Sequence, residues 1–109
     1  MDRRQQIRIQ FGLDVEYALK DGNWSYQTET QDCSEGGLLF RSELHFDVGA
    51  SLEVTLFGFS RNQARVRRCQ KIENQEIYEV GLAFVNLHPM ARTLLQQMAR
   101  LEYLATPSP

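Results

Sequence analysis

The chain has 109 residues, of which 42% are hydrophobic and 24% are charged. These fractions are typical of soluble globular proteins and exclude a disordered, collagen-like or coiled-coil chain, and the length suits one domain with its own core. Twelve basic and fourteen acidic residues give a net charge of −2. This overall charge does not favour a protein that coats nucleic acids through general electrostatic attraction.

The clearest pattern lies at 11–20, where apolar residues alternate with small or polar ones. The alternating residues are Phe11, Leu13, Val15, Tyr17 and Leu19. A period of two predicts a strand with one buried face. Turn-forming residues at 21–23 and a run rich in Thr and aromatic residues at 24–31 predict that a second strand follows in a hairpin.

Four further strands are predicted at 37–42, 51–59, 63–72 and 76–86, with a turn at Asn74-Gln75. From Pro89 to Leu104 the period becomes helical. One stripe of this helix carries Met90, Leu94, Met98 and Leu101, with Leu95 and Leu104 beside it. Pro89 suits the first helical position because its missing N–H needs no partner there.

Six short antiparallel strands with one apolar face each can bury these faces and pair their edge strands by closing into a barrel. We therefore expect an all-β fold, a six-stranded antiparallel β-barrel with a C-terminal α-helix over an open end or a flank. Residues 1–10 are expected to form a flexible arginine-rich arm, residues 11–104 the folded domain, and residues 105–109 a frayed tail.

The chain offers few groups for acid–base catalysis. His45 and His88 are its only histidines, and neither lies near a Ser or Cys in a nucleophile motif. Together with Cys33 and Cys69 they lack the paired spacings of a structural zinc site. Glycine fingerprints of phosphate and dinucleotide sites are absent. We therefore expect a protein that is not an enzyme and that holds no metal or cofactor.

The start of the chain is charged and has no apolar stretch behind it, so no secretory signal is predicted. No apolar run is long enough to span a membrane. Two cysteines are too few for a disulfide framework. We therefore expect a cytoplasmic protein with reduced thiols and no membrane insertion.

A cluster of basic residues lies in and just before the strand predicted at 63–72. It consists of Arg61, Arg65, Arg67, Arg68 and Lys71. Alternation places Arg65 and Arg67 on one face of the strand. It places Arg68 on the opposite face, the face of Val66 and Ile72. The cluster is either a solvated strand face or a surface for a ligand or partner.

A second arginine cluster precedes the first strand. Arg4 and Arg8 form an Arg-x-x-x-Arg pair with Arg3 beside it, and 23 residues lie between Arg8 and the run Asp32-x-Ser34-x-x-Gly37. Ten arginines in this chain give about one Arg-x-x-x-Arg by chance, whereas Asp-x-Ser-x-x-Gly is expected only about 0.02 times. The arginine pair alone therefore indicates little, and it is the order and spacing of the two motifs that point to a function.

These motifs resemble those of the PilZ family, which binds the bacterial second messenger cyclic di-GMP. The family pattern is Arg-x-x-x-Arg, a spacer, and then Asp or Asn-x-Ser-x-x-Gly. The resemblance continues at 37–40, 64–67 and 80–84 and covers essentially 3–104. It implies a six-stranded barrel with a C-terminal helix and a stand-alone receptor for cyclic di-GMP.

The resemblance also implies a set of ligand-binding residues. These are Arg3, Arg4, Arg8, Asp32, Ser34 and Gly37. Guanidinium groups can fork onto guanine or phosphate and stack on a base. Asp32 and Ser34 lie two apart, so on an extended segment they project from one face while Cys33 points away. Gly37 allows a close backbone approach or a positive φ.

We expect this chain to act by presenting a changed surface to a partner when the ligand binds. We therefore expect ordering of residues 1–10 on ligand binding to relay the signal to an unidentified downstream protein. By resemblance, the site takes either one cyclic di-GMP or a stacked pair. The chain itself is expected to be a monomer or a homodimer.

Two other functions remain open at this point. The first is a small barrel that binds single-stranded nucleic acid through Trp24, Tyr26, Phe57 and Phe59 and the basic run 61–71. The negative net charge argues against this, and no nucleic-acid partner is expected. The second is a PilZ-like protein-interaction adaptor without a ligand.

Overall fold

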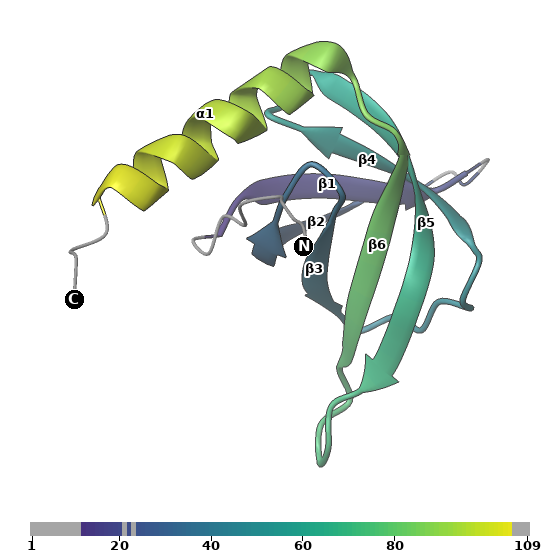
Figure 1. The fold of residues 1–109 in the computed structure, drawn as a ribbon. Coiled ribbons are helices and arrows are strands. Elements are labelled where there is room, and N and C mark those ends of the chain that lie inside the picture. The colour runs from purple at the N-terminus through teal and green to yellow at the C-terminus, as the bar shows by residue number, and fades with distance from the viewer. Residues whose placement is uncertain (1–11, 21, 23, 106–109) are drawn as a thin grey trace, which may run out of the picture.

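The computed structural model describes residues 12–20, 22 and 24–105. Within these residues the chain forms six strands and one helix in the predicted order. The elements are β1 (Asp14–Leu19), β2 (Tyr26–Cys33), β3 (Gly37–Ser42), β4 (Ser51–Leu56), β5 (Ser60–Lys71), β6 (Tyr78–Asn86) and α1 (Pro89–Ala105). The strands close into an antiparallel barrel in the order β1-β2-β3-β6-β5-β4 (Figure 1), which confirms the predicted fold class.

The inward side chains of the strands fill the barrel. Phe40, Leu52 and Val54 are essentially inaccessible to solvent. The ring of Tyr17 packs 4.6 Å from that of Phe40, and its hydroxyl lies 3.2 Å from Ser42 Oγ. Burial raises the pKa of the Tyr17 phenol, although the contact with Ser42 opposes this shift. The barrel therefore encloses a packed core rather than a ligand cavity.

The strand predicted at 51–59 ends early, at Leu56. Phe57 and Gly58 adopt φ values of 58° and 76°, and Phe59 N donates to Leu56 O at 3.2 Å. Phe57 and Gly58 are the two central residues of this turn, and their left-handed conformations reverse the chain within the three-residue connection 57–59. As a result β5 begins at Ser60, three residues before the predicted start.

The predicted orientation of Arg68 is wrong. Val66 pairs with Leu82, whereas Arg68 pairs with Gly81, so Arg67 is an extra residue in the strand. A β-bulge of this kind interrupts the alternation of side chains. Arg68 is therefore exposed rather than on the buried face of Val66, and its Nη2 donates to a carboxylate oxygen of Glu79 at 2.8 Å.

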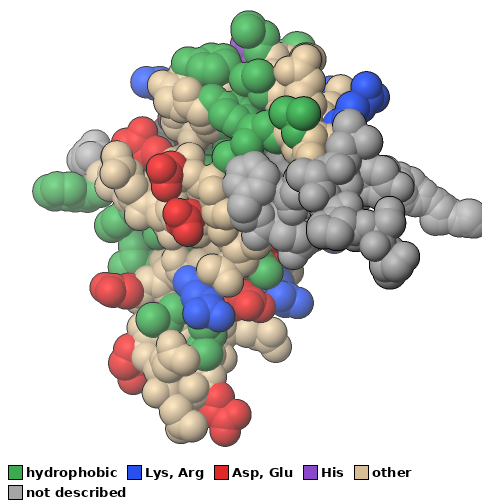
Figure 2. Space-filling model, turned by 90° about the vertical axis from the view of Figure 1, so that its left-hand side faces the viewer, with side chains coloured by type: hydrophobic (Ala, Val, Ile, Leu, Met, Phe, Trp, Pro, Cys, Tyr) green, Lys and Arg blue, Asp and Glu red, His purple; other side chains and the backbone are tan. Residues whose placement is uncertain are grey.

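Helix α1 runs across the top of the barrel in Figure 1 and extends past its left-hand side. The helix buries Ala91, Leu95 and Ala99, whereas the apolar stripe noted in the sequence is only partly covered: Met98 packs against the core, but Met90 is 58% and Leu101 66% exposed. The two alanines of the buried face are small, so the helix backbone can lie close to the barrel there. Figure 2 shows hydrophobic side chains gathered at the end of the molecule that carries α1.

Candidate functional site

The Asp32-x-Ser34-x-x-Gly37 motif forms the turn between β2 and β3. Ser34 N donates to Gly37 O at 2.9 Å, and Gly37 N donates to Ser34 O at 3.3 Å. The Ser34 hydroxyl accepts a hydrogen bond from Gly36 N at 3.2 Å. A serine side chain that accepts from the backbone two residues on is a common way to fix a tight turn. The motif is therefore a small, rigid hairpin connection.

A β-bulge just before the motif aims Asp32 away from the core. Thr30 pairs with Phe40 and Asp32 with Leu39, so Gln31 is an extra residue in β2. Thr30 and Cys33 both face the interior, at 3% and 0% exposure, and Asp32 between them is half-buried. Cys33 is thus fully buried whereas Asp32 is partly exposed, and the projection of Asp32 and Ser34 from one face stays a prediction. Ser34 is only 2% exposed, because it is folded into the turn.

Gly37 has a packing role that the sequence did not predict. Its φ is not positive, unlike those of Gly49 and Gly58, so of the two expected roles of this glycine the positive φ does not apply. A Cβ at Gly37 would collide with the carbonyl oxygen of Leu82. Gly37 therefore lets the start of β3 lie directly against β6.

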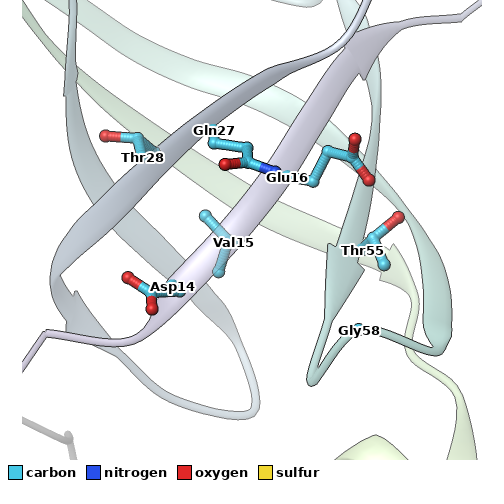
Figure 3. Close-up of a pocket in the computed structure, with 7 residues that line it drawn as sticks. All are labelled: Asp14, Val15, Glu16, Gln27, Thr28, Thr55 and Gly58. Carbon is cyan, nitrogen blue, oxygen red and sulfur yellow. The ribbon is translucent and has the colours of Figure 1, made fainter.

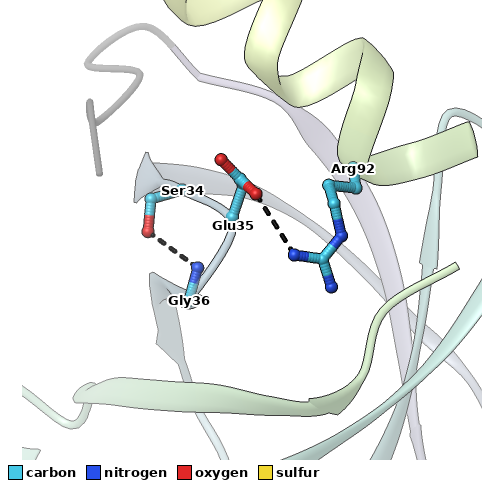
Figure 4. Close-up of polar contacts among 4 residues, drawn as sticks. All are labelled: Ser34, Glu35, Gly36 and Arg92. Carbon is cyan, nitrogen blue, oxygen red and sulfur yellow. Dashed lines mark hydrogen bonds and ion pairs between the residues drawn. The ribbon is translucent and has the colours of Figure 1, made fainter. Parts of the chain in front are cut away.

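The turn is held to the rest of the protein at two further points. Phe84 N donates to Gly36 O at 2.9 Å, which fastens the turn to β6. Arg92 Nη1 donates to Glu35 Oε1 at 3.3 Å, which connects the turn to α1 (Figure 4). Sequence reasoning missed Arg92. It lies 57 residues from Glu35, and nothing in the spacing of the two residues indicated that they meet.

The outer face of the sheet beside the motif carries small and basic residues. The register places Gly37 of β3 opposite Ala83 of β6, and Ala83 opposite Arg65 of β5. Since neighbouring strands are separated by about 4.8 Å, the backbones of Gly37 and Arg65 are about 10 Å apart. Arg65 is exposed. This surface adds positive charge within reach of an anion bound at the turn.

A hollow of about 530 Å³ lies elsewhere on the barrel, over β1, β2 and β4. Among the described residues that line it are the carboxylates of Asp14 and Glu16, and none of those described lining residues is a Lys or Arg (Figure 3). Carboxylates without a balancing cation repel an anionic ligand. The described lining of this hollow therefore favours a phosphate-bearing ligand less than the motif turn does.

Other kinds of site find little support in the described part of the chain. Among residues 12–20, 22 and 24–105, no three His, Cys, Asp or Glu side chains are grouped as metal ligands would be. In the same residues, no helix has the length and apolar character needed to cross a membrane. The predicted ligand residues Arg3, Arg4 and Arg8 lie outside the described residues.

Comparisons with known proteins point to one family. The sequence profile described as PilZ domain matches residues 2–101. Among solved structures, the inhibitor of motility MotI (DgrA) of Bacillus subtilis has a TM-score of 0.83 at 21% identity, covering 99% of this chain and 55% of that chain. A comparison with curated protein sequences finds no match.

Two structures of YcgR from Escherichia coli are also similar. YcgR in complex with cyclic di-GMP has a TM-score of 0.67 at 21% identity, covering 94% of this chain and 47% of that chain. Its PilZ domain with cyclic di-GMP has a TM-score of 0.62 at 20% identity, covering 95% of both chains. The chain thus spans about half the length of MotI and of full-length YcgR, and at these identities the likeness shows a shared fold.

Proposed function

The chain belongs to the PilZ domain family, and from this premise we propose that it is a receptor for cyclic di-GMP rather than an enzyme. The observation that carries the proposal is the rigid turn of the Asp32-x-Ser34-x-x-Gly37 motif on the outside of the barrel. The similar protein YcgR is crystallised with the same ligand. The proposed site combines this turn with the arginines of the N-terminal segment, Arg3, Arg4 and Arg8.

Each part of the proposed site has a chemical role. The outward Asp32 carboxylate accepts hydrogen bonds from the N1–H and N2–H₂ groups of a guanine edge. The arginines fork onto phosphate or guanine and stack on the purine face. Arg65, two strands from Gly37, adds positive charge for the phosphates. The ligand thus meets a carboxylate where it offers donors and cations where it offers anions.

The nucleic-acid alternative is less well supported. Trp24 and Phe59 are exposed, as stacking platforms require. The hollow that Phe59 and Arg61 line, however, also carries the carboxylates of Glu16 and Glu53. These charges repel a phosphate backbone, so the described aromatic surface does not form the basic track that a single strand needs.

We propose that the signal leaves through the N-terminal segment. Ordering of residues 1–10 over the ligand would create a new surface for a downstream protein, and the domain would act in the cytoplasm. Small-angle scattering with and without cyclic di-GMP tests this relay. A smaller radius of gyration with ligand supports it, and equal dimensions contradict it.

Charge-matched variants test the site itself. Asp32→Ala and Arg8→Ala are expected to weaken cyclic di-GMP binding at least about tenfold in calorimetry, because each removes a charge-assisted contact. Asp14→Ala and Arg61→Ala are the controls, since they remove the same charges from surfaces that lack the motif. Unchanged affinity in both site variants would overturn the site.

A further inference from the structure

The ion pair between Glu35 and Arg92 brings a charge of helix α1 to the motif turn. The guanidinium Nη1 of Arg92 lies 3.3 Å from Glu35 Oε1, and the two side chains point toward one another in Figure 4. The Glu35 side chain is 24% exposed and that of Arg92 52%. Glu35 is also the residue that follows Ser34 in the motif. The helix thus supplies a cation next to a carboxylate of the proposed ligand site.

An unbalanced carboxylate at this position would oppose ligand binding. Cyclic di-GMP carries two phosphates, and like charges at short range repel one another. The Arg92 guanidinium neutralises Glu35 and holds its side chain toward α1. The ion pair is partly exposed, so solvent and salt moderate its strength. Its loss is expected to produce a moderate change in affinity.

The turn does not depend on this ion pair for its shape. The backbone pair between Ser34 and Gly37 closes the hairpin, and Gly36 O accepts a hydrogen bond from Phe84 N at 2.9 Å. Removing Arg92 therefore leaves these contacts in place and changes mainly the charge that Glu35 presents. The effect of Arg92 on a ligand should then operate through Glu35.

We propose that Arg92 is a positioning residue of the cyclic di-GMP site, which balances the Glu35 carboxylate and holds it away from the phosphates. This inference rests on the proposed function and extends it to a residue outside both sequence motifs. It predicts how the effect of one substitution on ligand affinity depends on the other residue of the pair. Loss of Arg92 should matter only while Glu35 is charged.

A double-mutant cycle measured by calorimetry with cyclic di-GMP tests the proposal. Arg92→Ala should weaken binding about three- to fivefold, a range typical of a partly exposed ion pair. Glu35→Gln should bind as well as the wild type or better. The double variant should return to within about twofold of the wild type, and the loss in Arg92→Ala should shrink at about 0.5 M salt.

Two further variants control for the loss of a positive charge elsewhere on the helix and for misfolding. Arg100→Ala removes a cation from the same helix without touching Glu35 and should bind like the wild type. Arg92→Lys keeps the charge and should bind nearly as well, which separates charge balance from folding if Arg92→Ala is poorly folded.

The outcomes distinguish this inference from the proposed function. An Arg92→Ala variant that binds like the wild type overturns the inference alone. A double variant as weak as Arg92→Ala also overturns it, because Arg92 would then not act through Glu35. A folded wild-type chain that does not bind cyclic di-GMP overturns both the inference and the proposed function.

Discussion

The side chain of Asn62 accepts a hydrogen bond from the backbone N of His88 at 2.7 Å, which ties β5 to the start of α1. Asn62 is 2% exposed. Its Nδ2 donates to Val54 O at 3.2 Å and to Ser60 O at 3.0 Å. A single buried amide therefore fixes where the chain leaves the barrel and the helix begins, and with it the place from which Arg92 reaches the motif turn.

Replacing Asn62 should destabilise the whole domain. Asn62→Ala leaves the buried groups around it without their partner, and we expect the free energy of unfolding to fall by about 2 to 4 kcal/mol. Urea unfolding measures this change. Gln63→Ala, at the exposed neighbouring position, is the control and should stay within about 0.5 kcal/mol of the wild type. A loss below about 0.5 kcal/mol in Asn62→Ala would contradict this view of the network.

The start of α1 depends on a side-chain cap. His88 Nδ1 accepts a hydrogen bond from Met90 N at 3.0 Å, directly before Pro89 opens the helix. His88→Ala should therefore cost about 1 kcal/mol of stability, whereas His88→Asn should retain most of it because Asn is a good N-cap residue. Thermal unfolding compares the two. Equal melting temperatures for both variants would show that the cap contributes nothing.

Two glycines on neighbouring strands should respond very differently to a methyl group. In Gly37→Ala the Cβ would collide with the carbonyl oxygen of Leu82, whereas in Gly81→Ala it would have only ordinary contacts at 3.7 and 3.9 Å. We expect Gly37→Ala to lose about 2 to 4 kcal/mol or to fail to fold, and Gly81→Ala to fold normally. Circular dichroism and urea unfolding check both. Similar stability of the two variants would refute the packing role of Gly37.

Tyr17 should make stability depend on pH at the alkaline end. Because burial raises its pKa in the folded state, its contribution is complete below about pH 10, the pKa of an unfolded tyrosine, and is lost as pH rises through the folded pKa. The free energy of unfolding should therefore fall more steeply for the wild type than for Tyr17→Phe above about pH 10. Urea unfolding between about pH 9 and pH 11 measures the two slopes. Parallel slopes would rule out this effect.

The elements of the fold could be predicted because their signals are local. Alternation identified β1 around Val15 and Tyr17, and the change of period at Pro89 marked the start of the helix. The face of α1 that packs on the barrel could not be predicted, because two adjacent stripes of the helix are both apolar. Which one is buried depends on the barrel surface beneath it, and that information is not local.

The details of the site depended on contacts that the sequence does not display. The bulge at Arg67 turned Arg68 outward, because an extra residue reverses the alternation of side chains. Nothing in the amino-acid composition of the strand indicates such a bulge. The motif itself was visible from its spacing, but the collision that requires glycine at Gly37 comes from β6. The pairing of Glu35 with Arg92 arises from the docking of α1, which no motif encodes.

Titration of the purified chain with cyclic di-GMP by calorimetry tests the central claim most directly, with GTP and cyclic di-AMP as controls. The account predicts binding with a dissociation constant of about 1 µM or tighter, selective for cyclic di-GMP, and a stoichiometry that distinguishes one ligand from a stacked pair. A folded sample that shows no binding, or that binds the control nucleotides equally well, would contradict the account and favour an adaptor that acts through protein contacts alone.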